Sequence, residues 1–219
     1  MNYQFTKDKF ERISTKIRKI DELPTYDEVV AFMQFLEDKS IPDEQKPAKA
    51  WNKFCNEAFM WQIPNQEFVK ELASTILEFH DPITLETHAG IGKLSYWLRK
   101  HGVNVQPVDD FSYRLPQRMD SLVEKLDYKQ ALRKYSPSLV LNVWMPGNAD
   151  EIKDIIKTSF SYPSVNYLIE IGHPTRLYIP EDVKSLPRVS VDRYTTSILD
   201  MITKDGGHRK PTKAVLLIK

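Results

Sequence analysis

A glycine-bearing turn between two apolar runs is the feature that most constrains the fold of this chain. Residues 83–110 contain an apolar run ending in Glu86, then Gly90 and Gly92, a helical stretch, and a second apolar run ending in Asp109. Glycines let the backbone of such a turn approach a ligand, and the N-terminus of the following helix offers N–H groups. An acid after the second strand can accept hydrogen bonds from ribose hydroxyls. The segment therefore predicts a βαβ unit that binds a nucleoside-containing cofactor.

The spacing within the turn discriminates between cofactors. Residues 86–92 read E-T-H-A-G-I-G, which differs from the G-x-G-x-x-G fingerprint of dinucleotide-binding units. The order resembles the acidic-x-G-x-G-x-G signature of class I S-adenosylmethionine (SAM)-dependent methyltransferases, with His88 in place of the first glycine. The step from Gly90 to Asp109 agrees with the separation of roughly 20 residues expected for a ribose-binding acid. The alternative is an ordinary strand-turn-helix that binds no ligand.

Composition restricts the class of protein but not its activity. The chain of 219 residues is long enough for a single domain with one substantial hydrophobic core and an additional structural element. Lys and Arg number 31 against 30 Asp and Glu, so net charge gives a nucleic-acid partner no support. The single cysteine, Cys55, excludes an internal disulfide framework and a cysteine zinc cluster. A charged N-terminus and the absence of a long apolar stretch predict a soluble, cytoplasmic protein with no membrane partner.

The first eighty residues predict helices. Apolar residues recur at mostly three- and four-residue steps over 5–20 and 29–36, and an aromatic-rich stretch at 50–61 predicts a third helix. Asn65 is expected to cap a fourth. Because no glycine precedes Gly90 and strands alternate with helices only later, we expect a helical cap over residues 1–64 and an α/β domain over 65–219.

The remainder of the chain alternates between apolar runs and helical patterns. Strands are expected over 83–87, 103–108, 122–126, 139–144 and 166–172, with helices over 93–100, 128–135 and 150–160. Residues 194–201 and 214–219 flank the turn-forming sequence DGGHRKPT and predict a terminal antiparallel pair. The predicted fold is a three-layer α/β/α sandwich with a mostly parallel seven-stranded sheet and a terminal antiparallel strand, preceded by the helical cap. This sheet matches the one that the methyltransferase resemblance implies.

The resemblance covers roughly residues 65–219 and implies which residues contact SAM. In this family the glycine turn passes under the amino-acid end of SAM, and the acid after the second strand binds the ribose. Positions after the third strand contact the adenine, and the end of the fourth strand contacts cofactor and substrate. The implied cofactor-binding residues are Glu86, His88, Gly90, Gly92, Asp109, Asp127, Tyr128, Asn142, Val143 and Trp144, with Met145 and Pro146 following in the same turn. Asp110 is expected to be a loop or helix-capping residue.

His88 is the main departure from the family pattern. The usual glycine permits a positive φ and lets the methionine moiety lie close to the backbone. The imidazole of His88 has three alternatives: it points away, it contacts the cofactor or substrate, or it fills the site. The last would make the chain a methyltransferase fold that does not methylate.

Catalytic residues are harder to identify, because transfer from an activated sulfonium depends largely on positioning and desolvation. Candidates for a base are His173, Glu170 and His208, each of which has a plain structural alternative. The segment from Asn142 to Pro146 is a displaced and incomplete version of the N-P-P-[YFW] motif of amino-group DNA and RNA methyltransferases, in which an aromatic ring stacks on the extruded base. Trp144 is therefore a candidate stacking platform or simply part of the lining of the cofactor pocket. The five histidines show no metal-ligand spacing, and no metal is expected.

Three hypotheses remain open at this stage. The leading one is a SAM-dependent methyltransferase acting on a small-molecule or macromolecular acceptor. The second is a catalytically inactive, methyltransferase-like binding or regulatory protein. The third is an NAD(P)-dependent oxidoreductase, which requires the other glycine spacing.

Overall fold

The computed structural model describes most of the chain with several gaps. The described residues are 7–37, 54, 57, 60, 62–79, 83–112, 122–144, 149–172, 178–181, 183–187, 193–196 and 212–219. The helix expected over 50–61 therefore falls largely outside the described part. No helix within these ranges is long and apolar enough to cross a membrane.

A seven-stranded sheet forms the centre of the molecule, with the order β3-β2-β1-β4-β5-β7-β6. Neighbouring strands from β3 to β5 are parallel, whereas β7 is antiparallel to both β5 and β6. The strands are β1 Thr84–Thr87, β2 Val105–Asp109, β3 Glu124–Lys125, β4 Leu139–Val143, β5 Tyr167–Gly172, β6 Lys184–Pro187 and β7 Lys213–Ile218. The predicted mostly parallel seven-stranded sheet with a reversed terminal strand is confirmed.

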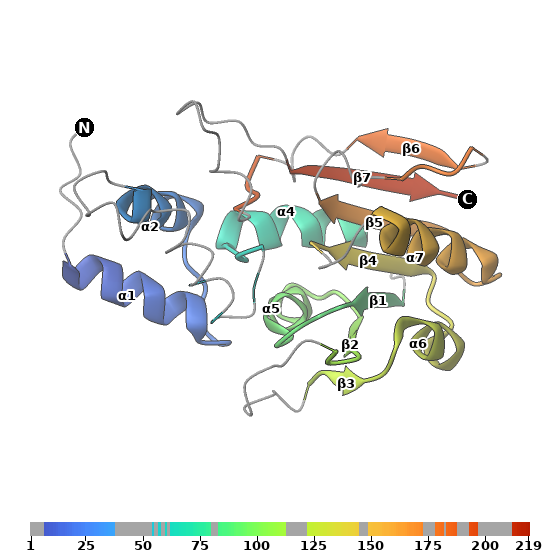
Figure 1. The fold of residues 1–219 in the computed structure, drawn as a ribbon, viewed down its shortest axis with the longest axis horizontal. Coiled ribbons are helices and arrows are strands. Elements are labelled where there is room, and N and C mark those ends of the chain that lie inside the picture. The colour runs from blue at the N-terminus through green and yellow to red at the C-terminus, as the bar shows by residue number, and fades with distance from the viewer. Residues whose placement is uncertain are drawn as a thin grey trace.

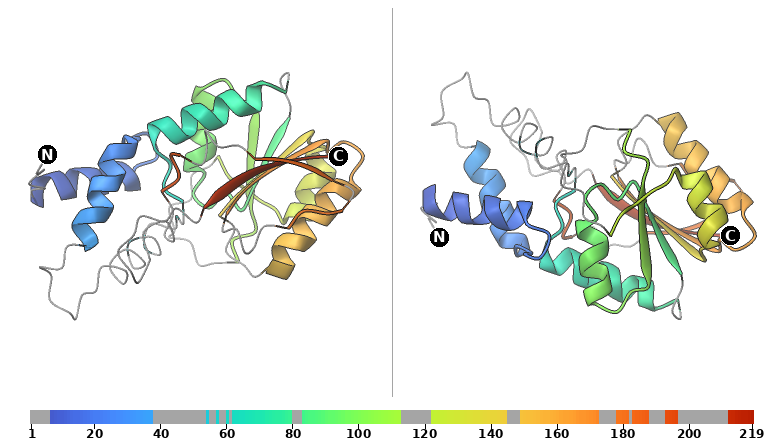
Figure 2. Two further views of the ribbon diagram at one scale, coloured as in Figure 1. Left: turned by 90° about the horizontal axis from the view of Figure 1, so that it is seen from above. Right: turned by 90° about the horizontal axis from the view of Figure 1, so that it is seen from below.

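Helices cover both faces of the sheet. Figure 2 shows α4 and α5 on one face and α6 and α7 on the other. Because alternate residues of a strand point to opposite faces, Leu139 and Leu141 of β4 pack with α4 and α5, while Val140 packs with α6 and α7. The helices around the sheet are α4 Gln66–Leu77, α5 Lys93–Lys100, α6 Tyr128–Tyr135 and α7 Ala149–Ser161. The three-layer α/β/α arrangement is therefore confirmed.

Two further helices, α1 Lys7–Arg18 and α2 Tyr26–Glu37, lie beyond the end of the sheet toward which the β4 and β5 arrows point (Figure 1). Ile13 and Ile17 of α1 and Phe32 of α2 are fully buried. They belong to the same hydrophobic cluster as Phe68 of α4 and the α5-facing side of the sheet. The N-terminal helices thus share a continuous core with the sheet, and the division into 1–64 and 65–219 remains a prediction.

Local signals explain where several helices begin and end. Thr25 and Glu28 form a reciprocal capping box, since the Thr25 N–H donates to Glu28 Oε2 and the Glu28 N–H donates to Thr25 Oγ1. Asn65 caps α4 by accepting the Phe68 N–H at 2.9 Å, as expected from the sequence. Gly102 follows the end of α5 and has φ 87°, the left-handed conformation that commonly terminates a helix.

The expected penultimate strand over 194–201 is wrong, because β6 is formed by Lys184–Pro187. Of the expected range, the described residues 194–196 are a turn and an irregular segment. Their polar groups bond instead to the chain before α4: Asn65 Nδ2 donates to the Tyr194 carbonyl, and the Ile63 N–H donates to the Thr196 carbonyl. This pairing takes the segment away from the sheet edge.

We expect Gly92→Ala to destabilise the fold far more than Gly102→Ala. Both glycines have a positive φ, 76° and 87°, but a Cβ at Gly92 would lie 2.6 Å from Val123 Cγ2, whereas a Cβ at Gly102 meets nothing within 4 Å. Left-handed strain alone costs about 1–2 kcal/mol, and overpacking adds about 1–3 kcal/mol. Urea unfolding measures both changes. Equal losses in the two variants would contradict the close contact at Gly92.

Candidate functional site

The turn after β1 alternates between the two signs of φ. His88 and Gly90 have φ 56° and Gly92 has φ 76°, while Ala89 and Ile91 between them are not in the positive-φ region. Successive backbone N–H groups in such an alternating segment form a concave site for anions and other acceptors. The two-residue spacing seen in the sequence therefore corresponds to alternate positive-φ residues at the carboxyl end of β1, immediately before α5.

Asp109, the last residue of β2, holds this turn in place. Its Oδ2 accepts the Gly90 N–H at 2.8 Å, and its Oδ1 accepts the Phe111 N–H at 2.8 Å. The Ala89 N–H also donates to the Val108 carbonyl at 3.0 Å. Each carboxylate oxygen keeps lone-pair capacity for a further donor. Asp109 thus fixes the turn and still has acceptor capacity at its edge. Asp110 accepts the Ser112 N–H at 2.9 Å, as expected of a loop residue.

Glu86 faces α5 rather than the open edge of the turn. Its carboxyl group is buried, and its Oε2 accepts from the hydroxyl of Ser95. Burial raises the pKa of Glu86 to about 7, while the Ser95 hydrogen bonds oppose that rise. The residue therefore ties the end of β1 to the first turn of α5.

His88 occupies a position that requires the left-handed conformation. Its ring lies 6.4 Å from the ring of Tyr128 on α6, measured between centroids. Its Nδ1 is buried and has no hydrogen-bond partner within the described part of the chain. Burial lowers the pKa of His88, while Asp109, Asp110 and Glu151 oppose that change. The turn therefore contains an imidazole whose buried Nδ1 has no partner among the residues described.

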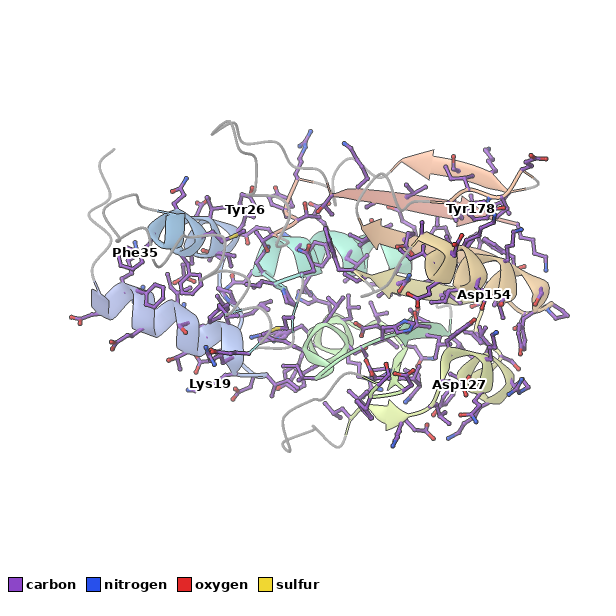
Figure 3. The ribbon with its side chains drawn as sticks, viewed as in Figure 1. Lys19, Tyr26, Phe35, Asp127, Asp154 and Tyr178 are labelled. Carbon is purple, nitrogen blue, oxygen red and sulfur yellow. The ribbon has the colours of Figure 1, made fainter. Side chains whose placement is uncertain are left out.

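The two residues expected near an adenine lie at the start of α6. Asp127 caps this helix, because its Oδ1 accepts the Gln130 N–H at 2.9 Å. The Tyr128 hydroxyl donates to Asp154 on α7, and Lys129 Nζ lies 3.2 Å from Asp154 Oδ2. Asp127 and Asp154 are labelled on these two helices in Figure 3. The hydrogen bond to Asp154 orients Tyr128, and the ring of Tyr128 contacts the ring of His88.

A buried polar chain crosses three neighbouring strands next to the turn. Thr87 Oγ1 donates to Asn142 Oδ1 at 3.3 Å, and Asn142 Nδ2 donates to Glu170 Oε2 at 2.6 Å. Thr87, Asn142 and Glu170 are in register on β1, β4 and β5 and are all buried. Burial raises the pKa of Glu170 to about 8, against the lowering effect of the Asn142 hydrogen bond. Asn142 and Glu170 thus satisfy one another inside the sheet.

Trp144 directly follows β4 and has φ 50°. Its N–H donates to the Ile171 carbonyl at 2.7 Å, and its side chain packs in the cluster on the α5 side of the sheet. Its indole Nε1 is buried without a hydrogen-bond partner among the residues described. Strained non-glycine residues with unmatched polar atoms gather at functional sites. His88 and Trp144 follow β1 and β4, the two strands that flank the point where the strand order reverses.

The predicted site residues do not all fall in the described part of the chain. Glu86, His88, Gly90, Gly92, Asp109, Asn142 and Val143 gather at the carboxyl ends of β1, β2 and β4, and Trp144 follows β4. Met145, Pro146, His173 and His208 lie outside the described residues. Sequence reasoning missed Ser95 and Thr87, which bond to Glu86 and Asn142. Ser95 lies 9 residues from Glu86 along the chain and Thr87 lies 55 residues from Asn142, so no local pattern marked either contact.

Glu170→Gln is expected to make stability less dependent on pH. In the unfolded chain Glu170 ionises near its ordinary value of 4.5, whereas the folded chain keeps the proton up to about 8. The folded state then binds more protons between these values, so the parent loses stability as pH rises from 4.5 to 8. The variant should gain about 2–4 kcal/mol on the parent between pH 5 and pH 8. Urea unfolding at these two pH values measures the difference, and parallel curves would refute the assignment.

Comparison with known proteins gave structural neighbours only. No family model and no curated protein matches the sequence. The chain is similar to magnesium protoporphyrin IX methyltransferase from Synechocystis PCC 6803, with 12% identity, TM-score 0.42 and 100% of both chains covered. It is similar to the plantazolicin methyltransferase BpumL, with 10% identity, TM-score 0.44, and 97% of this chain and 98% of that one covered. A SAM-dependent methyltransferase from Archaeoglobus fulgidus has 12% identity and TM-score 0.42, covering 71% and 95%. The strand order and the reversed β7 are those of the class I SAM-dependent methyltransferase fold.

Proposed function

We propose that this chain is a SAM-dependent methyltransferase. The observation that carries the proposal is the turn of residues 88–92, whose φ signs alternate and whose Gly90 N–H is bound by Asp109, at the point where the strand order reverses. Ligands of open α/β sheets bind at the carboxyl ends of the strands at this point. The turn also has the acidic-x-x-x-G-x-G sequence that the family resemblance rests on.

The residues present fit the parts of SAM. The backbone of Gly90 and Gly92 would hold the amino-acid end, and the carboxylate of Asp109 would accept hydrogen bonds from the ribose hydroxyls. Tyr128 and Asp127 would border the adenine, with Asn142, Val143 and Trp144 along the other side. The unmatched nitrogens of His88 and Trp144 support the fit, because buried polar atoms without partners in a protein usually meet a ligand, an ion or a water.

The chemistry requires little acid–base work from the protein. SAM, when bound, would supply a methyl group activated by its sulfonium. The turn would fix the position of the donor, and the buried wall formed by Trp144 would exclude water from that side. Glu170 is committed to Asn142 within the sheet, so we assign it a structural part and not that of a base. The methyl acceptor would approach from the carboxyl ends of β4 and β5.

A second candidate function, a methyltransferase-like binding protein without activity, is favoured by one observation. The His88 side chain stands where the family has glycine, and it contacts Tyr128 across the turn. An oxidoreductase receives less support, because β7 runs antiparallel between β5 and β6. Dinucleotide-binding sheets of the doubly wound type are mostly parallel.

We expect S-adenosylhomocysteine (SAH) and SAM to raise the thermal midpoint of the parent, and the His88→Gly variant to respond at least as strongly. A ligand at 100 times its Kd stabilises the native state by about 2.7 kcal/mol. Glycine also removes the strain of an L residue at φ 56°. A differential scanning fluorimetry series with SAM, SAH and NADH separates the hypotheses. A shift of the thermal midpoint in His88→Gly but not in the parent would favour the inactive binding protein. A shift with NADH alone would favour the oxidoreductase. A lost response in His88→Gly would mean that the imidazole itself contacts the ligand.

Asp109→Ala should weaken SAH binding by about 1.5–3 kcal/mol, the range for losing charged hydrogen bonds. The loss combines the missing ribose acceptor with the release of the Gly90 and Phe111 N–H groups. Asp110→Ala is the matched control, because it removes the neighbouring carboxylate, which bonds Ser112, and leaves the Asp109 contacts with Gly90 and Phe111 in place. Isothermal titration calorimetry measures both. Equal affinities in the two variants would remove Asp109 from the proposed site.

A further inference from the structure

Lys93 is a buried lysine at the first position of α5, directly after the glycine turn. Its side chain is 2% exposed, and its ammonium donates to three backbone carbonyls of the α1 end: Lys16 at 2.7 Å, Ile17 at 2.8 Å and Lys19 at 2.5 Å. An ammonium has three N–H donors, so these contacts use its full capacity. One side chain from the candidate site therefore holds the end of an N-terminal helix.

The charge of Lys93 is unfavourably placed with respect to its own helix, α5, but favourably placed with respect to α1. A cation at the N-terminus of a helix is unfavourable, because that end of the helix dipole is positive. The ammonium of Lys93 lies instead at the C-terminal end of α1, where the carbonyls lack partners within the helix and the dipole is negative. Lys19, labelled in Figure 3, marks this end of α1. Lys93 thus connects the beginning of α5 to the end of α1 electrostatically.

A second donor from the same helix strengthens the connection. Trp97 Nε1 donates to the Ile20 carbonyl at 2.9 Å, one helical turn after Lys93. The receiving segment is itself well defined, since Lys16 Nζ bonds Glu28 Oε1 at 2.8 Å and Glu28 closes the capping box of α2. Any change in the position of α5 is therefore transmitted to both N-terminal helices.

Stability alone does not account for a lysine at this position. Burial lowers the pKa of Lys93 to about 7, while Glu22 and Asp21 oppose that change. Keeping an ammonium in this environment costs free energy that an apolar side chain would not. The residue before Lys93 is Gly92, which also contacts Val123 so closely that no Cβ fits. The lysine is therefore adjacent to a turn residue that has little room for a side chain.

We propose that Lys93 is a positioning residue that couples the docking of α1 to the conformation of the 88–92 turn. The ammonium can reach the α1 carbonyls only while Gly92 holds the start of α5 in place, and α1 in turn restrains that start. The N-terminal helices are thus part of the turn's support. On the proposed function, the same coupling makes SAM binding and α1 docking mutually reinforcing.

The test compares amide hydrogen exchange in Lys93→Met and Lys100→Met without ligand. Methionine keeps an unbranched stem, and Lys100 is an exposed residue of the same helix, so the control removes the same charge. We expect Lys93→Met to speed exchange about tenfold or more both in α1 and at the turn. The turn amides to follow are those of Ala89, Gly90 and Gly92, which have defined acceptors. Trp97→Phe, which removes only the indole donor, should give a smaller change in the same amides.

Three outcomes would overturn the coupling. The first is faster exchange in α1 with an unchanged turn, which would leave Lys93 as a plain helix cap. The second is no change in either segment. The third is a uniform acceleration that includes the amides of the β5–β7 ladder and α7, which would mean a general loss of stability.

A separate arm with SAH tests the consequence for binding. The proposed function predicts that SAH slows exchange at the turn and in α1 of the parent, and that Lys93→Met binds SAH about tenfold more weakly than Lys100→Met. If SAH leaves the parent turn unchanged, the proposed function fails while the ligand-free comparison still decides the coupling. If SAH protects the turn but the two variants bind it equally, the coupling does not reach the cofactor.

Discussion

One carboxylate accepts two backbone N–H groups and thereby fixes the turn that follows the central strand β1. Asp109 ends β2, and its oxygens accept from Gly90, which follows β1, and from Phe111, which follows Asp109 by two residues. The contact fixes where the chain leaves β1 and hence where α5 begins. The sheet then places β4 on the other side of β1, so that the reversal in strand order lies beside this turn. The position of the candidate site, the position of α5 and the hydrogen bonds from α5 to the end of α1 all follow from that arrangement.

Much of the fold could be predicted because its signals are local. Helices α5 and α6 begin and end at the residues expected, since Gly92, Gly102 and Asp127 lie at their boundaries. The glycine spacing located the turn, whereas the left-handed conformation of His88 itself was seen only in the structure. The edge strand β6 was misplaced, because strand pairing depends on partners far away in the sequence. Tyr194 and Thr196 bond to residues roughly 130 positions earlier, which no local pattern reveals.

The candidate site was predicted in outline, but its supports were not. The positions of Glu86, Gly90 and Asp109 follow from the order of strands and turns, so a motif was enough to find them. Lys93 was overlooked because its acceptors are 74 to 77 residues away and are backbone carbonyls, which carry no sequence signature. Ser95 was overlooked for the related reason that a serine in a first helical turn is common. Conflict with the helix dipole was the one visible sign at Lys93.

The buried polar chain of Thr87, Asn142 and Glu170 has a consequence for the direction in which its hydrogen bonds point. A carboxyl group whose pKa is about 8 carries a proton at neutral pH, and a protonated Glu170 is a donor as well as an acceptor. An amide can turn over, so Asn142 would then offer its oxygen to Glu170 and its nitrogen to Thr87. A proton on Glu170 therefore makes a second arrangement possible, in which the hydrogen bonds of this row point the opposite way as far as β1, the strand that enters the turn.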